Sequence, residues 1–323
     1  GNGTLKVTYE SGRSYEVEQD GSITQKEELT PEEAKKIVFA TGCGEALLVE
    51  TADEKVYYVE NLQQGVMQKI EITDAEIITT NGIREAGEDF FIDNNGKMYV
   101  WGYYSMKPEI LDVSETVLNG KNITNVQSYE GTKIALDSEG KVYTWGNNDY
   151  GQLGDGTNED SDEPICISEI EENALNGKNI VEIKSDGSTI IALDSEGKVY
   201  TWGYNSKGQL GNGTGGEWGN YSNVPICISD IEGNKLKEKN IVKVQNSYDT
   251  MIALDNEGKV YTWGYNWKGC LGNGTNVEYS NEPQCISDIP ENALNGKNIV
   301  EVKSDVYTII TLDNEGKVYM WGN

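Results

Sequence analysis

The chain has 323 residues and a formal net charge of −28, with 26 Lys plus Arg against 54 Asp plus Glu, and it contains no histidine. So acidic a protein repels nucleic acids and anionic membranes, because binding to either depends on Lys and Arg that neutralise negative charge. Lack of histidine removes the commonest general base and the usual transition-metal ligand, so we expect no enzyme, no metal and no cofactor.

The first hundred residues predict short strands. Candidate strands lie at 5–9, 14–18 and 23–28, joined by SerGlyArg and AspGlySer turns, and they match the second, third and fourth strands of a short repeat. Residues 30–39, TPEEAKKIVF, start with helix-capping and first-turn residues and predict one helical turn. Weak copies of a hairpin follow at Val56 (VYYVENLQQG) and Met98 (MYVWGYYSMK).

From there on, an eleven-residue unit dominates the chain. LDSEGKVYTWG occupies residues 136–146, and close copies return at 193–203, 254–264 and 312–322. Their tryptophans, with Trp101 from a weaker copy, are spaced 44, 57, 61 and 58 residues apart. Self-similarity at such a period predicts a repeat architecture with one small sheet per copy.

The fullest copy, residues 179–231, divides into four strands. They are predicted at 179–184, 189–194, 198–202 and 225–228, with Gly197 at positive φ in the central hairpin. Pro225 places the fourth strand at an edge, because proline cannot donate to a ladder. The linking segment LNGKN carries a leucine that we expect to fill the gap between neighbouring sheets.

Four strands, a link and four strands again describe an all-β fold, a single β-propeller over residues 1–323. Residues 1–100 are read as degenerate blades and 101–323 as near-consensus repeats. Seven blades are favoured and six stay open, with the ring sealed near the N- and C-termini. Trp145, Trp202, Trp263 and Trp321 recur inside one strand and are predicted to be core residues.

The passage VYTWGYNSKGQLGNGT, residues 199–214, resembles the regulator of chromosome condensation repeat, as do the copies from Val142 and Val260. The resemblance implies a propeller, usually of seven blades, and suggests a bacterial member of a family that includes exchange factors for small GTPases, ubiquitin ligase modules and secreted bacterial inhibitors of β-lactamase. The family's first loop usually carries a histidine. Here the loops read SYEGT, SDGST, NSYDT and SDVYT, which argues against exchange activity.

Three of the five cysteines, Cys166, Cys227 and Cys285, share one repeat position, while Cys270 replaces the Gln of GQLG and Cys43 lies in an earlier copy. Equivalent positions of neighbouring blades are too far apart for a disulfide, whose Cα atoms lie within about 7 Å. All five are therefore predicted to be reduced structural thiols.

Comparison of the copies separates two faces. One carries the uniform turns DSEGK and DNEGK and the LNGKN link, and the other carries loops that differ in every copy. Exposed Tyr and Trp are the usual anchors of protein interfaces, so the variable face is the predicted partner-binding surface. Its residues are Tyr104, Tyr129, Tyr150, Asp186, Trp218, Tyr221, Tyr248, Asp249, Trp267, Asp305 and Tyr307.

Two interpretations stay open on this face. Tyr204 and Tyr265, which follow the WG pair, either contact a partner or pack between blades. The acidic run from Gly154, GDGTNEDSDE, offers oxygen ligands for calcium at Asp155, Asn158 and Asp160, but it lacks the spacing of an EF-hand and reads better as a solvated loop.

Together these observations predict a monomeric, non-catalytic scaffold that binds an unknown protein partner through the aromatic and acidic face, outside the cell or on the surface of a bacterium. Nucleic-acid binding is not expected because the chain is acidic. Membrane insertion is not expected because no apolar run of about twenty residues occurs. The alternative is a carbohydrate-binding propeller with Trp and Tyr platforms. An inhibitor of a secreted enzyme such as a β-lactamase and a nucleotide-exchange factor are less favoured.

Overall fold

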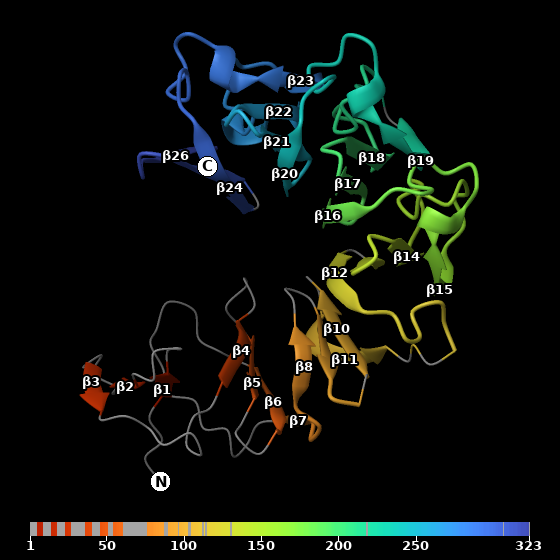
Figure 1. The fold of residues 1–323 in the computed structure, drawn as a ribbon, viewed down its shortest axis with the longest axis vertical. Helices are drawn as coiled ribbons and strands as arrows, with labels where there is room; N and C mark the ends of the chain where they lie inside the picture. Colours follow the sequence, from red (N-terminus) through yellow and green to blue (C-terminus); the bar gives the residue numbers. More distant parts are fainter. Residues whose placement is uncertain are drawn as a thin grey trace. The chain divides into compact units, whose positions relative to one another are not determined.

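The structure is a computed structural model, and strands dominate it (Figure 1). By internal contacts the chain divides into two compact units, Gly1–Ser114 and Glu115–Asn323, which are described separately. No helix in the described part of the chain is long and apolar enough to cross a bilayer. The structure describes residues 5–8, 14–17, 23–26, 36–40, 46–50, 54–60, 76–86, 90–95, 97–102, 105–111, 113, 115–129, 131–217, 219–305 and 307–322.

The N-terminal unit contains three antiparallel sheets among its described strands. The first is β1 (Leu5–Thr8), β2 (Ser14–Val17) and β3 (Ile23–Lys26), close to the three predicted strands. The second is β4 (Lys36–Ala40), β5 (Ala46–Glu50), β6 (Val56–Glu60) and β7 (Glu76–Thr79). The third is β8 (Ile83–Ala86), β9 (Phe90–Asp93), β10 (Met98–Gly102) and β11 (Ser105–Leu111).

The helical turn predicted at 30–39 is wrong for its second half. Residues 36–40, KIVFA, form strand β4, which pairs antiparallel with β5 in a register that joins Lys36 to Glu50 and Phe39 to Leu48. Pairing with a neighbouring strand outweighs the local capping signal, because Ile, Val and Phe fit a pleated sheet. Residues 30–35, which carry that signal, lie outside the described residues.

The C-terminal unit repeats one sheet. Its strands follow in sequence order within each sheet, so that Pro225 lies in an outer strand, as predicted. The four sheets are β12 (Ile123–Tyr129), β13 (Thr132–Asp137), β14 (Val142–Gly146) and β15 (Ser161–Cys166); β16 (Ile180–Ser185), β17 (Thr189–Asp194), β18 (Val199–Tyr204) and β19 (Tyr221–Cys227); β20 (Ile241–Ser247), β21 (Thr250–Asp255), β22 (Val260–Tyr265) and β23 (Tyr279–Cys285); and β24 (Ile299–Asp305), β25 (Thr308–Asp313) and β26 (Val318–Gly322).

Short 3-10 helices complete this unit. Three of them follow the outer strands, namely η2 (Ile167–Glu169), η3 (Ile228–Asp230) and η5 (Ile286–Asp288). A fourth, η4 (Trp267–Gly269), lies in the loop between β22 and β23. The described strands thus form five four-stranded and two three-stranded sheets, and the architecture is all-β. The seven-blade ring and its closure stay predictions, because the two units are described separately.

Each hairpin of the repeat is closed by a buried aspartate. Asp194 Oδ1 accepts hydrogen bonds from the backbone N–H of Glu196 and Lys198, both at 2.9 Å, and its Oδ2 accepts one from the Tyr200 hydroxyl at 2.9 Å. Gly197 has a φ of 82°, as predicted. The same Asp and Tyr pairing recurs with Tyr143, Tyr261 and Tyr319 at 2.8 to 2.9 Å. The repeated unit LDSEGKVY therefore forms a turn in which the aspartate side chain accepts hydrogen bonds from the turn backbone and from the tyrosine hydroxyl.

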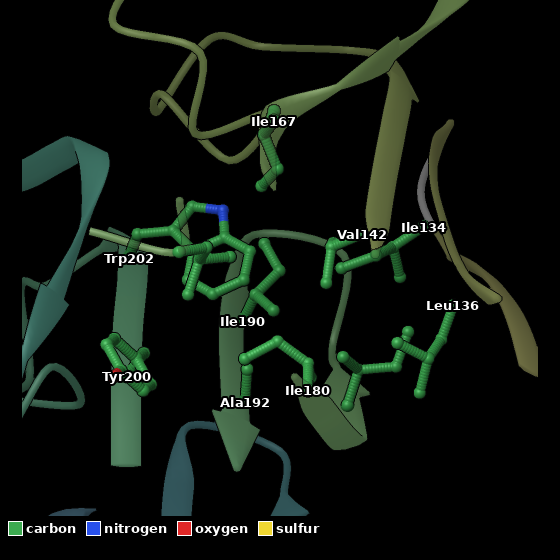
Figure 2. Packing of buried hydrophobic residues seen from close by; sticks show 11 residues of the cluster. Ile134, Leu136, Val142, Ile167, Ile180, Ile190, Ala192, Tyr200 and Trp202 are labelled. Carbon is green, nitrogen blue, oxygen red and sulfur yellow. The ribbon is translucent and has the colours of Figure 1, made fainter. Parts of the chain in front are cut away.

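Neighbouring sheets of the C-terminal unit pack through a tryptophan, and Figure 2 shows Trp202 among the buried residues of one such cluster. Trp202 of β18 is buried against residues of the preceding sheet, and its Nε1 donates to the carbonyl of Gln152 at 2.8 Å. A Cβ on Gly154 would lie 2.7 Å from the same Nε1, so only glycine fits beneath the indole. Trp263 and Trp321 bond the equivalent carbonyls, of Gln209 and Cys270, at 2.9 Å.

The predicted core is confirmed for Trp145, Trp202 and Trp263, which are buried, whereas Trp321 in the last sheet is only partly buried. The leucines of the linking segments, Leu175 and Leu294, are also buried, in clusters that contain residues of two consecutive sheets. Consecutive sheets of the C-terminal unit therefore pack face to face and bury a shared hydrophobic cluster.

Candidate functional site

The loops that differ between copies form one continuous surface of the C-terminal unit. In an antiparallel sheet, the loops after the first and third strands emerge at the same end. The long loop of one sheet contacts the next sheet there, since Gln209 Nε2 donates to Asp249 Oδ1 in the next first loop at 2.8 Å and Gly213 N–H donates to the carbonyl of Asn281 in strand β23 at 2.9 Å. We call this surface the loop face, and the opposite surface, with the DSEGK and DNEGK turns and the links, the turn face.

The long loop after the third strand is held from inside by the repeated residues. In the β16–β19 sheet, Asn205 Oδ1 accepts from Leu210 N–H at 3.0 Å, and its Nδ2 donates to the Thr214 carbonyl at 3.2 Å. Thr201 Oγ1 donates to the Leu210 carbonyl at 2.7 Å. Because Asn, Leu and Thr of the repeat do this work, the positions between them are free to vary.

Three of the predicted partner-binding aromatics are exposed on this surface. The exposed fractions are 49% for Trp267, 45% for Tyr248 and 44% for Tyr221. Large rings exposed to this degree are candidates for an interface.

The other predicted tyrosines are partly buried by contacts between copies. Tyr150 packs on Tyr204 of the next sheet with ring centroids 4.7 Å apart. Tyr307 packs on Tyr248 with centroids 5.5 Å apart. Tyr129 lies against Gly187, where an added Cβ would approach its ring to 2.5 Å. Each of these three tyrosines thus contacts a residue of another copy, and for Tyr150 and Tyr307 that residue is a second tyrosine.

Tyr204 and Tyr265, for which both roles were open, pack across sheet boundaries. Tyr204 contacts Tyr150 of the preceding copy. Lys207 of the preceding copy lies over the ring of Tyr265, with Nζ 5.2 Å from the centroid, and the Trp267 ring stacks on Tyr265 with centroids 6.1 Å apart and an interplanar angle of 16°. Both tyrosines are only partly buried, so they join the frame to the exposed rings.

Some predicted residues lie outside this description. Tyr104 and Trp218 are not among the described residues, and of Asp305 the structure describes the backbone at the end of β24.

Asp186 and Asp249 belong to the first loops of neighbouring sheets. Asp186 Oδ1 accepts from Thr189 N–H at 2.8 Å and Ser188 N–H at 3.1 Å, which closes its own loop. Its Oδ2 is buried and has no hydrogen-bond partner among the described residues. Burial, with the charge of Asp249 adding to it, raises the pKa of Asp186 to about 8. The loop face therefore holds a carboxyl group that is protonated near neutral pH.

Two residues of the loop face have a backbone conformation that favours glycine. Tyr248 has a φ of 53° and Lys268 a φ of 55°, in the left-handed region. At the position of Tyr248, the preceding copy has Gly187, with a φ of 94°. Sequence reasoning named Tyr248 but missed its strain, although the comparison of SDGST with NSYDT, aligned on threonine, contained the signal.

The acidic run from Gly154 is organised by its own side chains. Asp155 Oδ1 accepts from Thr157 N–H and Oγ1, both at 2.9 Å, and Asp160 Oδ1 accepts from Asn148 N–H at 2.8 Å. Within the described residues, no group of three or more Cys, Asp or Glu side chains is placed to hold a metal ion. The oxygens that suggested calcium thus act as caps of an exposed loop.

The described cysteines are free thiols, as predicted: Cys166, Cys227 and Cys285 are partly buried and Cys270 is buried. Burial, assisted by neighbouring aspartates, raises the pKa of Cys227 and Cys285 to about 11. A thiol nucleophile needs the opposite shift, so these cysteines are unsuited to catalysis. Cys43 lies outside the described residues.

Comparison with known families gives one match. The model of the regulator of chromosome condensation (RCC1) repeat matches residues 139–192, 196–254 and 257–304. These segments contain the three near-consensus copies.

Curated relatives share parts of the chain. The E3 ubiquitin-protein ligase HERC2 of Homo sapiens is 27% identical over 219 residues, which are 67% of this chain and 4% of the ligase. The ultraviolet-B receptor UVR8 of Arabidopsis thaliana is 32% identical over 179 residues, which are 55% of this chain and 37% of the receptor. The chain thus spans a small part of the ligase and little more than a third of the receptor.

Solved structures show the same fold. Human WBSCR16 matches with a TM-score of 0.63 and 17% identity, over 96% of this chain and 79% of that one. Prp20p of Saccharomyces cerevisiae, described together with its binding to Gsp1p and histones, matches with a TM-score of 0.58 and 16% identity, over 100% of this chain and 80% of that one. At these identities the likeness concerns the fold alone.

Proposed function

Because this chain belongs to the RCC1-repeat proteins, we propose that it is a non-catalytic scaffold that binds a protein partner through the loop face of residues 115–323. The observation that carries the proposal is the contrast within one chain between a uniform frame and a variable surface. The frame residues are buried and bonded to each other, whereas Trp267, Tyr248 and Tyr221 are exposed on the loop face.

The chemistry of the described residues supports binding rather than catalysis. The chain has no histidine, and the thiols of Cys227 and Cys285 have a raised pKa. Asp155 and Asp160 are occupied as loop caps. A nucleophile with an adjacent base, which acid-base and covalent catalysis require, is not formed among the described residues.

The test is a capture experiment with matched variants. Purified protein is used to capture partners from extracts of the source organism, alongside Trp267→Ala and Met320→Ala. Met320 is also exposed, at 70%, but it lies in β26 away from the loops. We expect a defined partner to be lost with Trp267→Ala, retained with Met320→Ala, and the melting temperature to be unchanged in both.

Two results would count against the proposal. A marked fall in melting temperature for Trp267→Ala would show that this ring belongs to the core. Saturable binding to a polysaccharide on a glycan array, dependent on Trp267 and without any protein partner, would favour the carbohydrate-binding alternative, for which the exposed ring of Trp267, stacked on Tyr265, offers an aromatic face.

A further inference from the structure

The β20–β23 sheet departs from its neighbours in both loops of the loop face. Tyr248 is in its first loop and Lys268 in its second, and both have positive φ. An L residue in this region is strained, and such strain persists where the surroundings or the function maintain it. The two preceding copies have Tyr150 and Lys207 at the position equivalent to Lys268, and neither of these residues has a positive φ.

These conformations place two rings in solvent. Tyr248 and Trp267, which precedes Lys268, are among the most exposed aromatic side chains of the described residues. In the preceding copy the same positions hold Gly187 and Ser206. This sheet therefore combines backbone strain with large rings where its neighbour has small residues.

The long loops of the loop face carry mostly acidic residues. The long loops at 147–160, 205–220 and 266–278 contain only two basic residues, Lys207 and Lys268. The lysines of the DSEGK and DNEGK turns lie on the turn face, where Lys198 pairs with Asp230 at 2.8 Å and Lys259 pairs with Asp288 at 2.9 Å. The same loops carry the carboxylates Asp149, Asp155, Glu159, Asp160, Glu217 and Glu278, and the first loop of the β20–β23 sheet adds Asp249.

Lys207 shows how this surface holds a cation. Its Nζ lies 5.2 Å from the centroid of Tyr265 and forms an ion pair with Glu278. An ammonium group is thus bound by an aromatic face and a carboxylate from the next sheet, the two attractions that such rings and charges provide. Lys268 Nζ lies over Trp267 in the same way, at 5.7 Å.

We propose that the loops of the β20–β23 sheet are the centre of the partner surface and that they bind a protein segment presenting lysine or arginine side chains. Trp267 and Tyr248 supply the aromatic faces, and the carboxylates of the loop face supply the complementary charge. The inference rests on the proposed function. It adds the chemistry of the partner and names the loops that contribute most of the binding free energy.

The test uses labelled synthetic peptides of equal length that are rich in lysine and arginine, rich in aspartate and glutamate, or neutral. Binding is followed by fluorescence anisotropy at low and high salt. We expect saturable binding of the basic peptides only, weakened by salt because exposed charges are screened. Trp267→Ala should weaken it about tenfold, since losing a partly desolvated cation–π contact changes binding by that order.

Two matched pairs of variants separate specific binding from general attraction to an acidic protein. Glu159→Gln with Glu217→Gln removes two carboxylates of the loop face, and Glu171→Gln with Glu172→Gln removes two exposed carboxylates of the turn face. We expect the first pair to weaken binding several-fold and the second to leave it unchanged. Equal losses for both pairs, or equal binding of the neutral peptides, would overturn the inference.

Tyr248→Gly adds a variant that cannot fail merely by unfolding. Glycine relieves the positive φ, so the melting temperature should stay equal or rise while basic-peptide binding falls. Unchanged binding in this variant would also overturn the inference. If binding of a captured protein depends on Trp267 but is insensitive to salt and to the loop-face charges, the proposed function stands and the inference of a basic partner is wrong. If binding of no captured protein depends on Trp267, both the proposed function and the inference are wrong.

Discussion

Gly211→Ala tests how neighbouring sheets are held together. Gly211 has a φ of 65°, and a Cβ at this position would lie 2.6 Å from Nε1 of Trp263 and 2.8 Å from its Cδ1. Such a distance is far inside van der Waals contact, so the buried indole must move. Its hydrogen bond to the Gln209 carbonyl, 2.9 Å long, is then lost or lengthened.

Three costs add in this variant. The left-handed backbone costs about 1–2 kcal/mol for an L residue. Overpacking a buried ring costs about 1–3 kcal/mol, and the weakened hydrogen bond costs about 1 kcal/mol. We expect the free energy of unfolding to fall by about 3–6 kcal/mol.

Gly213→Ala is the matched control. Gly213 has a φ of 86°, but the nearest atom to an added Cβ is Glu282 Oε1 at 3.5 Å, an ordinary contact with a flexible side chain. Only the backbone cost applies, about 1–2 kcal/mol. Urea unfolding followed by circular dichroism gives both values. Equal losses in the two variants would refute the conclusion that glycine is required beneath the indole.

Two further predictions concern buried polar groups. The pKa of Asp186 is raised to about 8, so the folded protein keeps a proton there that the unfolded chain releases above about pH 4, and the stability of the fold falls as pH rises toward 8. The melting temperature of Asp186→Asn should therefore rise relative to that of the parent protein between pH 5 and pH 9. Parallel pH profiles of the two melting temperatures would contradict this. Tyr200→Phe removes a hydroxyl that donates to buried Asp194 at 2.9 Å, and should lower the free energy of unfolding by about 2 kcal/mol in a denaturant titration, with no loss pointing to another donor for that carboxylate.

The frame of the C-terminal unit was predictable because each copy repeats the same local rules. Alternating apolar residues, Gly197 in the hairpin and Pro225 at the edge placed the four strands to within a few residues, except the fourth, which begins earlier at Tyr221. The recurring tryptophans were recognised as core for the same reason. What one copy leaves ambiguous, four copies decide.

The helical turn at 30–39 failed where only one segment was available. The first-turn signal of TPEE is local, but KIVFA pairs with β5 at 46–50, which a reading of ten residues cannot contain. The role of Asp194 was missed for a related reason. Asp194 lies six positions before Tyr200 and reads as part of a solvated turn until the two side chains are seen to form a hydrogen bond.

The candidate site divides in the same way. The variable loops could be found by comparing copies, and Tyr221, Tyr248 and Trp267 are indeed exposed. Tyr150 and Tyr204 could not be told apart from them by residue type, because both rings are covered by a contact between copies.

By itself, the sequence determined the repeat, its strands, its turns and the face on which the copies differ, because periodicity and glycine or proline chemistry act within one copy. Only the tertiary structure decided which rings are covered and which reach solvent, and that Tyr248 and Lys268 are strained. Exposure depends on what the neighbouring sheet brings to the same point in space, and backbone strain depends on how the whole loop is held. Trp267 and Tyr150 lie in equivalent loops, and their different neighbours make one exposed and the other half-buried.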